Sequence, residues 1–136
     1  MLNYKFYIDK YDWDVEVYYY ITKYDVKNIC NKLRKLDCEY NSFIDIYDNI
    51  TENKLNTGLT YSSYKHKSSI IIVSKTSTPS EFINSLTHEL YHLVTHIVDY
   101  YNIDFISEEA AYLQGSTAQI IYNHSKDFFC SCKHKN

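Results

Sequence analysis

The apolar and polar positions in the first half of the chain follow patterns typical of β-strands. Aromatic and β-branched residues alternate in part with polar ones, and turn-like stretches separate the runs. The short connection 10–12 indicates a hairpin, and residues 26–36 show the spacing of an amphipathic helix that packs on the sheet. Residues 70–73 are all apolar, which favours a strand buried on both faces or covered by a helix. We predict five strands, at residues 4–8, 13–21, 43–50, 59–64 and 69–74.

The second half of the chain shows helical periodicity. Thr78 is an expected N-cap, Pro79 occupies the first helical position, and Glu81 completes a capping box. A long helix is predicted over 78–102, and a second one from about 107 through 121. The whole pattern predicts an α+β fold with a mainly antiparallel sheet of about five strands, one helix from the first half, and a C-terminal pair of helices.

Composition narrows the class of protein. The chain has 136 residues, of which 45% are hydrophobic, with only two Gly and one Pro, so we expect a single domain spanning 1–136 with a polar tail from about 124. A net charge of -3 and scattered lysines argue against nucleic-acid binding. No apolar run approaches the roughly 20 residues that cross a bilayer. We expect no membrane contact, a soluble intracellular protein, and reduced thiols at its four cysteines.

The sequence His88-Glu89-Leu90-Tyr91-His92 is an H-E-x-x-H motif in the middle of the long predicted helix. His88 and His92 project from one helix face about 6 Å apart along the axis, so both imidazoles can bind one Zn²⁺. Glu89 lies roughly 100° round the helix, where its carboxylate can act as a general base on a water at the metal. The alternative interpretation is a pair of surface histidines beside an unrelated glutamate. We favour zinc binding because the motif lies on a strongly predicted helix.

A catalytic zinc needs a third protein ligand, and three downstream residues are candidates. His96 follows His92 by one turn, but three histidines on successive turns of a straight helix span about 12 Å. No Gly lies nearby to turn the chain back as in H-E-x-x-H-x-x-G-x-x-H, so His96 is expected on a solvated face or beside the ligands without touching the metal. Glu108 and Glu109 open the next helix and differ by about 100° in direction, so only one of them can face the metal.

Residues 68–122 resemble the gluzincins, in which H-E-x-x-H is followed on a second helix by a ligating Glu and a small residue. The matching segment here is Glu109-Ala110-Ala111-Tyr112-Leu113. The chain is most similar to minimal zincin-like peptidases of phages and prophages, and more distantly to the ImmA-like peptidases. The resemblance implies a zincin-like fold, Glu109 as the third ligand, and a substrate cleft at the strand over 69–74.

Other residues have weaker functional interpretations. Tyr91, Tyr112 and His124 are near enough in sequence to donate to an oxyanion, although packing or solvation explains each of them as well. Asp99 and Asp104 are candidates to orient a ligating histidine, or they are exposed acids near a helix end. A C-x-C-x-H cluster lies in the tail, and we interpret it as tail thiols rather than a second metal site: Cys130, Cys132 and His134.

We predict zinc-dependent hydrolysis of peptide bonds, with His88, His92 and Glu109 as metal ligands and Glu89 as the base. The expected partner is a peptide or protein substrate. If the chain is encoded by a phage, it is expected in the host cytoplasm or the virion, with a phage or host protein as a further partner. The main alternative is a zincin-fold binding or structural protein whose zinc braces two helices. A third is hydrolysis of a bond other than a peptide, because the motif fixes the activated water and not its target.

Overall fold

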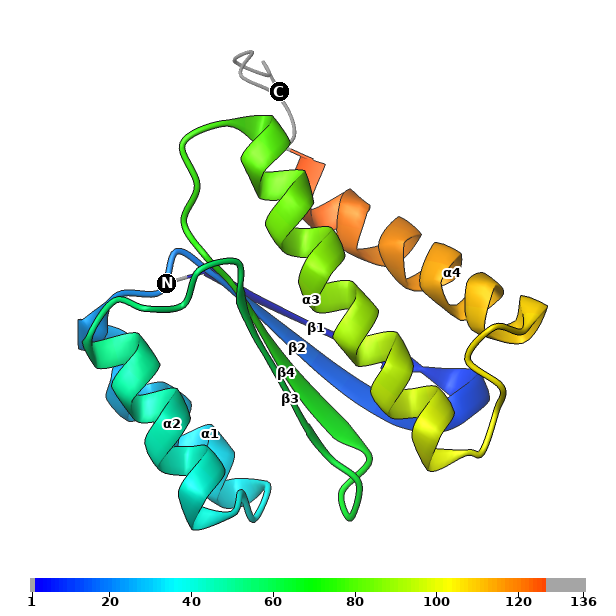
Figure 1. Ribbon diagram of the computed structural model, residues 1–136, viewed down its shortest axis with the longest axis horizontal. Coiled ribbons are helices and arrows are strands. Elements are labelled where there is room, and N and C mark those ends of the chain that lie inside the picture. Colours follow the sequence, from blue (N-terminus) through cyan, green and yellow to red (C-terminus); the bar gives the residue numbers. More distant parts are fainter. Residues whose placement is uncertain (1, 127–136) are drawn as a thin grey trace.

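The computed structural model describes residues 2–126, which form a four-stranded sheet with two helices on each side (Figure 1). The fold is α+β, as predicted. Short 3₁₀ turns at Asp9–Tyr11 and Lys23–Asp25 follow the first two strands. The strands are β1 (Leu2–Ile8), β2 (Trp13–Tyr19), β3 (Gly58–Ser63) and β4 (Ser68–Val73). The helices are α1 (Val26–Lys35), α2 (Tyr40–Thr51), α3 (Pro79–Tyr100) and α4 (Glu108–Ser125).

The sheet is mixed, with strand order β1-β2-β4-β3. β1 pairs with β2 and β3 pairs with β4 in antiparallel hairpins, whereas β2 and β4 run parallel in the centre. Two of the three pairings are antiparallel, as a mainly antiparallel sheet requires, but the central pairing is parallel and the predicted number of about five strands was wrong. The parallel pairing arises because α1, α2 and β3 carry the chain back across the sheet before β4 enters it.

The segment 43–50 belongs to helix α2, and its prediction as a strand was wrong. Phe43, Ile46 and Ile50 recur at helical spacing, and Ile46 and Ile50 are buried against the sheet beside Ile72. Burial of this helical face overrides the β propensity of a segment rich in isoleucine and aromatic residues. The first half of the chain thus supplies two helices rather than one.

Each face of the sheet has its own hydrophobic core. On β2, Val15 and Val17 point into the core under α3 and α4, while Tyr18 points into the core under α1 and α2. On β4, Ile71 faces the first core and Ile72 the second. This alternation confirms the prediction that the apolar run at 70–73 is covered on both faces.

Helix α3 begins where the capping signals predict. The Thr78 hydroxyl accepts a hydrogen bond from the backbone N–H of Glu81 at 3.2 Å. The Glu81 carboxylate accepts from the N–H of Ser77 at 2.9 Å, one residue earlier than a capping box requires. Helix α4 begins after Ser107, whose side chain caps Ala110. None of the helices formed by residues 2–126 is both long enough and apolar enough to cross a membrane.

Candidate functional site

The side of α3 that faces β3 lines a groove of about 530 Å³. The opposite wall comes from the start of β3, the connection before it, and Asn49 at the end of α2. In Figure 1, α3 runs along one face of the sheet beside α4, and it contacts β3 and β4. Four side chains of α3 that can bind a metal or transfer a proton line this groove: His88, Glu89, His92 and His96.

His88 and His92 converge as their spacing predicts. Their Nε2 atoms are 3.3 Å apart and their ring centroids 5.0 Å apart. Two nitrogen ligands at about 2.0–2.1 Å from one tetrahedral zinc lie about 3.4 Å from each other. The separation therefore fits two ligands of one ion, and it also fits a hydrogen bond between the two rings. His88 is exposed and His92 is half-buried.

Glu89 is buried at the bottom of the groove, with 2% of its surface exposed. The Thr57 hydroxyl donates to its Oε2 at 2.9 Å. The Thr60 hydroxyl contacts its Oε1 at 3.1 Å and its backbone oxygen at 3.0 Å. Each carboxylate oxygen has two lone pairs, and the threonine hydroxyl occupies one of them. The second lone pair can accept a hydrogen bond from a water in the groove. Sequence reasoning missed both threonines because nothing local links 57–60 to 89.

Gly58 lets the start of β3 approach the H-E-x-x-H motif. Its φ is +142°, and a Cβ there would lie 2.0 Å from the backbone oxygen of Ile72 and 3.2 Å from Cγ of Glu89. No other residue fits such a contact without moving the strand. One of the two glycines of the chain therefore sets the distance between β3 and Glu89. No local pattern in the sequence predicts this role for Gly58.

His96 also lines the groove, one helical turn beyond His92. Its Nδ1 lies 2.7 Å from the Ser62 hydroxyl on β3. Burial, reinforced by the nearby His92, holds the pKa of His96 below its usual value. The half-buried ring contacts β3 and does not lie on a purely solvated face.

The structure does not bring Glu109 into the groove. Its carboxylate accepts a hydrogen bond from the Tyr11 hydroxyl at 2.9 Å and lies 3.4 Å from Nζ of Lys10. Its neighbours Ala110 and Leu113 are buried in the core under α3 and α4, which directs the start of α4 towards the β1–β2 turn. Among residues 2–126, no three His, Cys, Asp or Glu side chains are grouped so that they could hold a metal ion.

The weaker candidates lie outside the groove. Tyr91 packs edge-on against Phe105, Tyr112 is exposed, and His124 stacks on Tyr4. The two acids contact other partners: Asp99 accepts from Tyr64, and Asp104 accepts from the N–H of Ile106. Cys30 and Cys38 are free thiols. The cluster Cys130, Cys132 and His134 lies outside the described residues.

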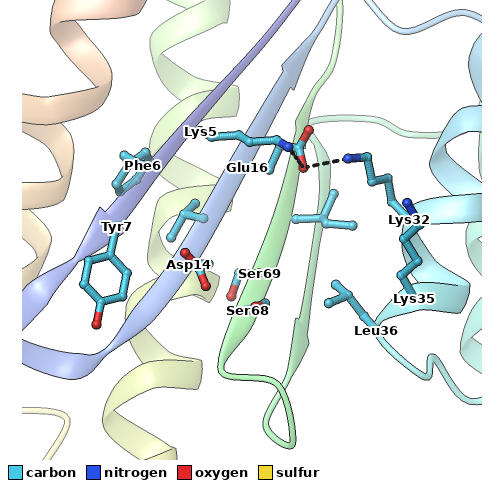
Figure 2. A pocket seen from close by; sticks show the side chains of 12 residues that line it. Lys5, Phe6, Tyr7, Asp14, Glu16, Lys32, Lys35, Leu36, Ser68 and Ser69 are labelled. Carbon is cyan, nitrogen blue, oxygen red and sulfur yellow. Dashed lines mark ion pairs between the residues drawn. The ribbon is translucent and has the colours of Figure 1, made fainter.

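A second groove of about 560 Å³ lies on the α1 side of the sheet (Figure 2). Glu16 in this groove has several partners. Its Oε2 lies 4.0 Å from Nζ of Lys5 and 3.7 Å from Nζ of Lys32. Tyr18 and Asn3 also donate to Glu16, at 2.6 and 2.9 Å. Its lining includes no histidine or cysteine, and this acid is already engaged by its neighbours, so the histidine groove is the better candidate for chemistry.

No known protein family, curated protein or solved structure matches this chain. The geometry of the groove and the H-E-x-x-H motif are therefore the observations that point to a function.

Proposed function

We propose that the chain is a zinc-dependent hydrolase of peptide bonds, with His88 and His92 as metal ligands and Glu89 as the general base. One observation carries the proposal. The Nε2 atoms of the two histidines are 3.3 Å apart beside the buried carboxylate of Glu89, in one groove. Two imidazoles are ligands that zinc prefers, and the separation fits a tetrahedral ion.

The chain's own groups supply the proton transfer. When bound, zinc would polarise the scissile carbonyl and make an attacking water more acidic. Glu89 would take a proton from that water and deliver it to the leaving amine. Thr57 and Thr60 hold the carboxylate in one orientation, which keeps the base aligned through both transfers.

The edge of the sheet supports a peptide as the substrate. The strand at the groove was expected to be 69–74, but β4 pairs with β2 on one side and β3 on the other. Among the described strands, β3 is at the edge, and its first residues line the groove. An edge strand can pair with an extended peptide through main-chain hydrogen bonds. In a phage, the substrate would be a phage or host protein.

The third ligand remains a prediction. The resemblance to gluzincins assigns the third ligand to Glu109. The carboxylate of Glu109 lies outside the groove and accepts a hydrogen bond from Tyr11. Binding by Glu109 would require this hydrogen bond to break and the first turn of α4 to move towards the groove.

A structural or binding protein is the second candidate function. The hydrogen bonds from Thr57 and Thr60 to Glu89 join β3 to α3, which is what a structural carboxylate would do. In that case zinc would brace the site, and the charge of Glu89 would have no role in turnover.

Zinc content and peptide hydrolysis test the proposal together. The wild-type chain should bind about one zinc, and His88→Ala or His92→Ala should remove it. Glu89→Gln should keep zinc and lose at least about a hundredfold in kcat. His66→Ala and Glu81→Gln are matched controls outside the groove and should change neither quantity. Full zinc content in both histidine variants would reject the metal site, and unchanged turnover in Glu89→Gln would favour the structural alternative.

A further inference from the structure

A chain of hydrogen bonds runs from the buried core to the groove through His96. Nε1 of Trp13 donates to the Ser69 hydroxyl at 2.8 Å, and this hydroxyl lies 2.6 Å from that of Ser62. The Ser62 hydroxyl lies 2.7 Å from Nδ1 of His96. Trp13 and Ser69 are almost completely buried, so the inner end of the chain is shielded from solvent.

The donors and acceptors fix the direction of this chain. An indole N–H can only donate, so Ser69 accepts from Trp13. The hydroxyl hydrogen of Ser69 then has the Ser62 oxygen as its one acceptor within residues 2–126. Ser62 in turn donates to Nδ1 of His96. This is the arrangement in which each hydroxyl hydrogen finds its acceptor within the chain, and buried hydroxyls rarely go without one.

The consequence concerns the other nitrogen of the ring. An imidazole that accepts at Nδ1 carries its proton on Nε2. Because Nδ1 is engaged by Ser62, Nε2 is the nitrogen left to contact a molecule in the groove that His96 lines. His96 therefore presents an N–H donor to that molecule, whereas a metal ligand would present a lone pair.

The ring separations agree with a donor rather than a third ligand. The rings of His92 and His96 are 6.4 Å apart between centroids, compared with 5.0 Å for His88 and His92. The rings of two ligands of one tetrahedral zinc lie about 5 Å apart. The ring of His96 thus lies further along the groove, one helical turn beyond the pair of histidines expected to bind the metal.

We propose that Trp13, Ser69 and Ser62 hold His96 as a neutral Nε2–H donor to the carbonyl oxygen of a bound substrate. This role rests on the proposed hydrolase. The donor would stabilise negative charge as it develops on that oxygen, next to the water that Glu89 activates. The two serines and the tryptophan act as positioning residues, because they reach the substrate only through the imidazole.

The tautomer can be measured without any turnover. ¹⁵N NMR of histidine-labelled full-length protein, with and without zinc, should show His96 protonated at Nε2 and unprotonated at Nδ1. Ser62→Ala should mix the two tautomers, and Ser62→Thr should restore the wild-type signal. Ser68→Ala, a neighbouring hydroxyl outside the chain of hydrogen bonds, serves as the control. A proton on Nδ1 in the wild type, or no response to Ser62→Ala, would overturn the proposal.

Kinetics test the contact with the substrate. His96→Ala should keep its zinc, leave KM within a few-fold of wild type, and lower kcat by about 10²–10³. His96→Gln should recover part of kcat because its amide can donate from a similar position. Loss of zinc would make His96 a ligand, and an unchanged kcat would remove its role in hydrolysis. If the wild-type chain turned over no peptide, the hydrolase and the substrate contact would both fail, while the NMR result would still decide the tautomer.

Discussion

At the scale of single residues, Glu89 is the most tightly held group of the groove. Thr57 and Thr60 each donate to one of its carboxylate oxygens, and Gly58 between them lets the strand come close enough to do so. A hydrogen bond to a buried charged group is worth about 1.5–3 kcal/mol. These two threonines are therefore expected to contribute to stability as well as to the orientation of the carboxylate.

Replacing Thr60 tests this contribution. Thr60→Val keeps the shape of the side chain but removes the hydroxyl hydrogen that the backbone oxygen and Oε1 of Glu89 share, so we expect the free energy of unfolding to fall by about 1–3 kcal/mol. Thr60→Ser keeps the hydroxyl and should lose less. Urea denaturation followed by circular dichroism measures both variants. Equal loss in both would attribute the effect to packing rather than to the carboxylate.

Glu109 and Glu108 offer a comparison at the same scale. If the family resemblance assigns the third ligand correctly, Glu109→Ala should weaken zinc binding by orders of magnitude and Glu108→Ala should leave it unchanged. Zinc retention against a chelator measures the difference. Equal retention in both variants would reject Glu109 as a ligand and leave it with its described contacts to Tyr11 and Lys10. Loss in Glu108→Ala alone would move the ligand by one residue.

At the scale of elements, α3 carries His88, Glu89, His92 and His96, and the hydroxyl of Thr78 caps the first turn of this helix. Thr78→Ala removes the hydroxyl that accepts from the N–H of Glu81, and we expect the free energy of unfolding to fall by about 1 kcal/mol. Thr78→Ser should retain most of the stability. Urea denaturation of the pair checks the prediction, and equal stability of Thr78→Ala and wild type would contradict it.

The same helix shows what a sequence can predict. Long apolar periodicity and strong capping residues predict α3 from its first turn to its last, and with it the convergence of His88 and His92. In α2 the periodicity is short and the apolar residues are β-branched or aromatic, so local propensity predicts the wrong element. The place of β3 at the sheet edge depends on pairing between distant segments. The hydrogen-bond partners of Glu89 and His96 lie on β3 or directly before it, so no local sequence pattern predicts them.

At the scale of the whole molecule, the low pKa of His96 links stability to pH. Burial and His92 make the folded state bind this proton less readily than the unfolded chain, whose histidine pKa is about 6.5. The contribution to stability is therefore complete above that pKa and is lost as pH falls through the lower folded-state pKa. We expect the metal-free protein to be less stable at about pH 5.5 than at about pH 7.5.

His96→Gln should reduce this dependence, because its side chain does not titrate. Urea denaturation at the two pH values, on wild type and variant, gives the comparison. The same fall in stability in both proteins would show that other groups cause it.

The position of Trp13 has a practical consequence for spectroscopy. It is the one tryptophan of the chain, fully buried, with its N–H on Ser69 and its ring edge-on to Tyr64 and Tyr100. Indole fluorescence depends on hydrogen bonding and on contact with water, and this indole is the inner end of the hydrogen bonds that lead to His96. The intrinsic emission of the unmodified protein should therefore respond both to unfolding and to occupancy of the groove, so that zinc or peptide titrations need no attached dye.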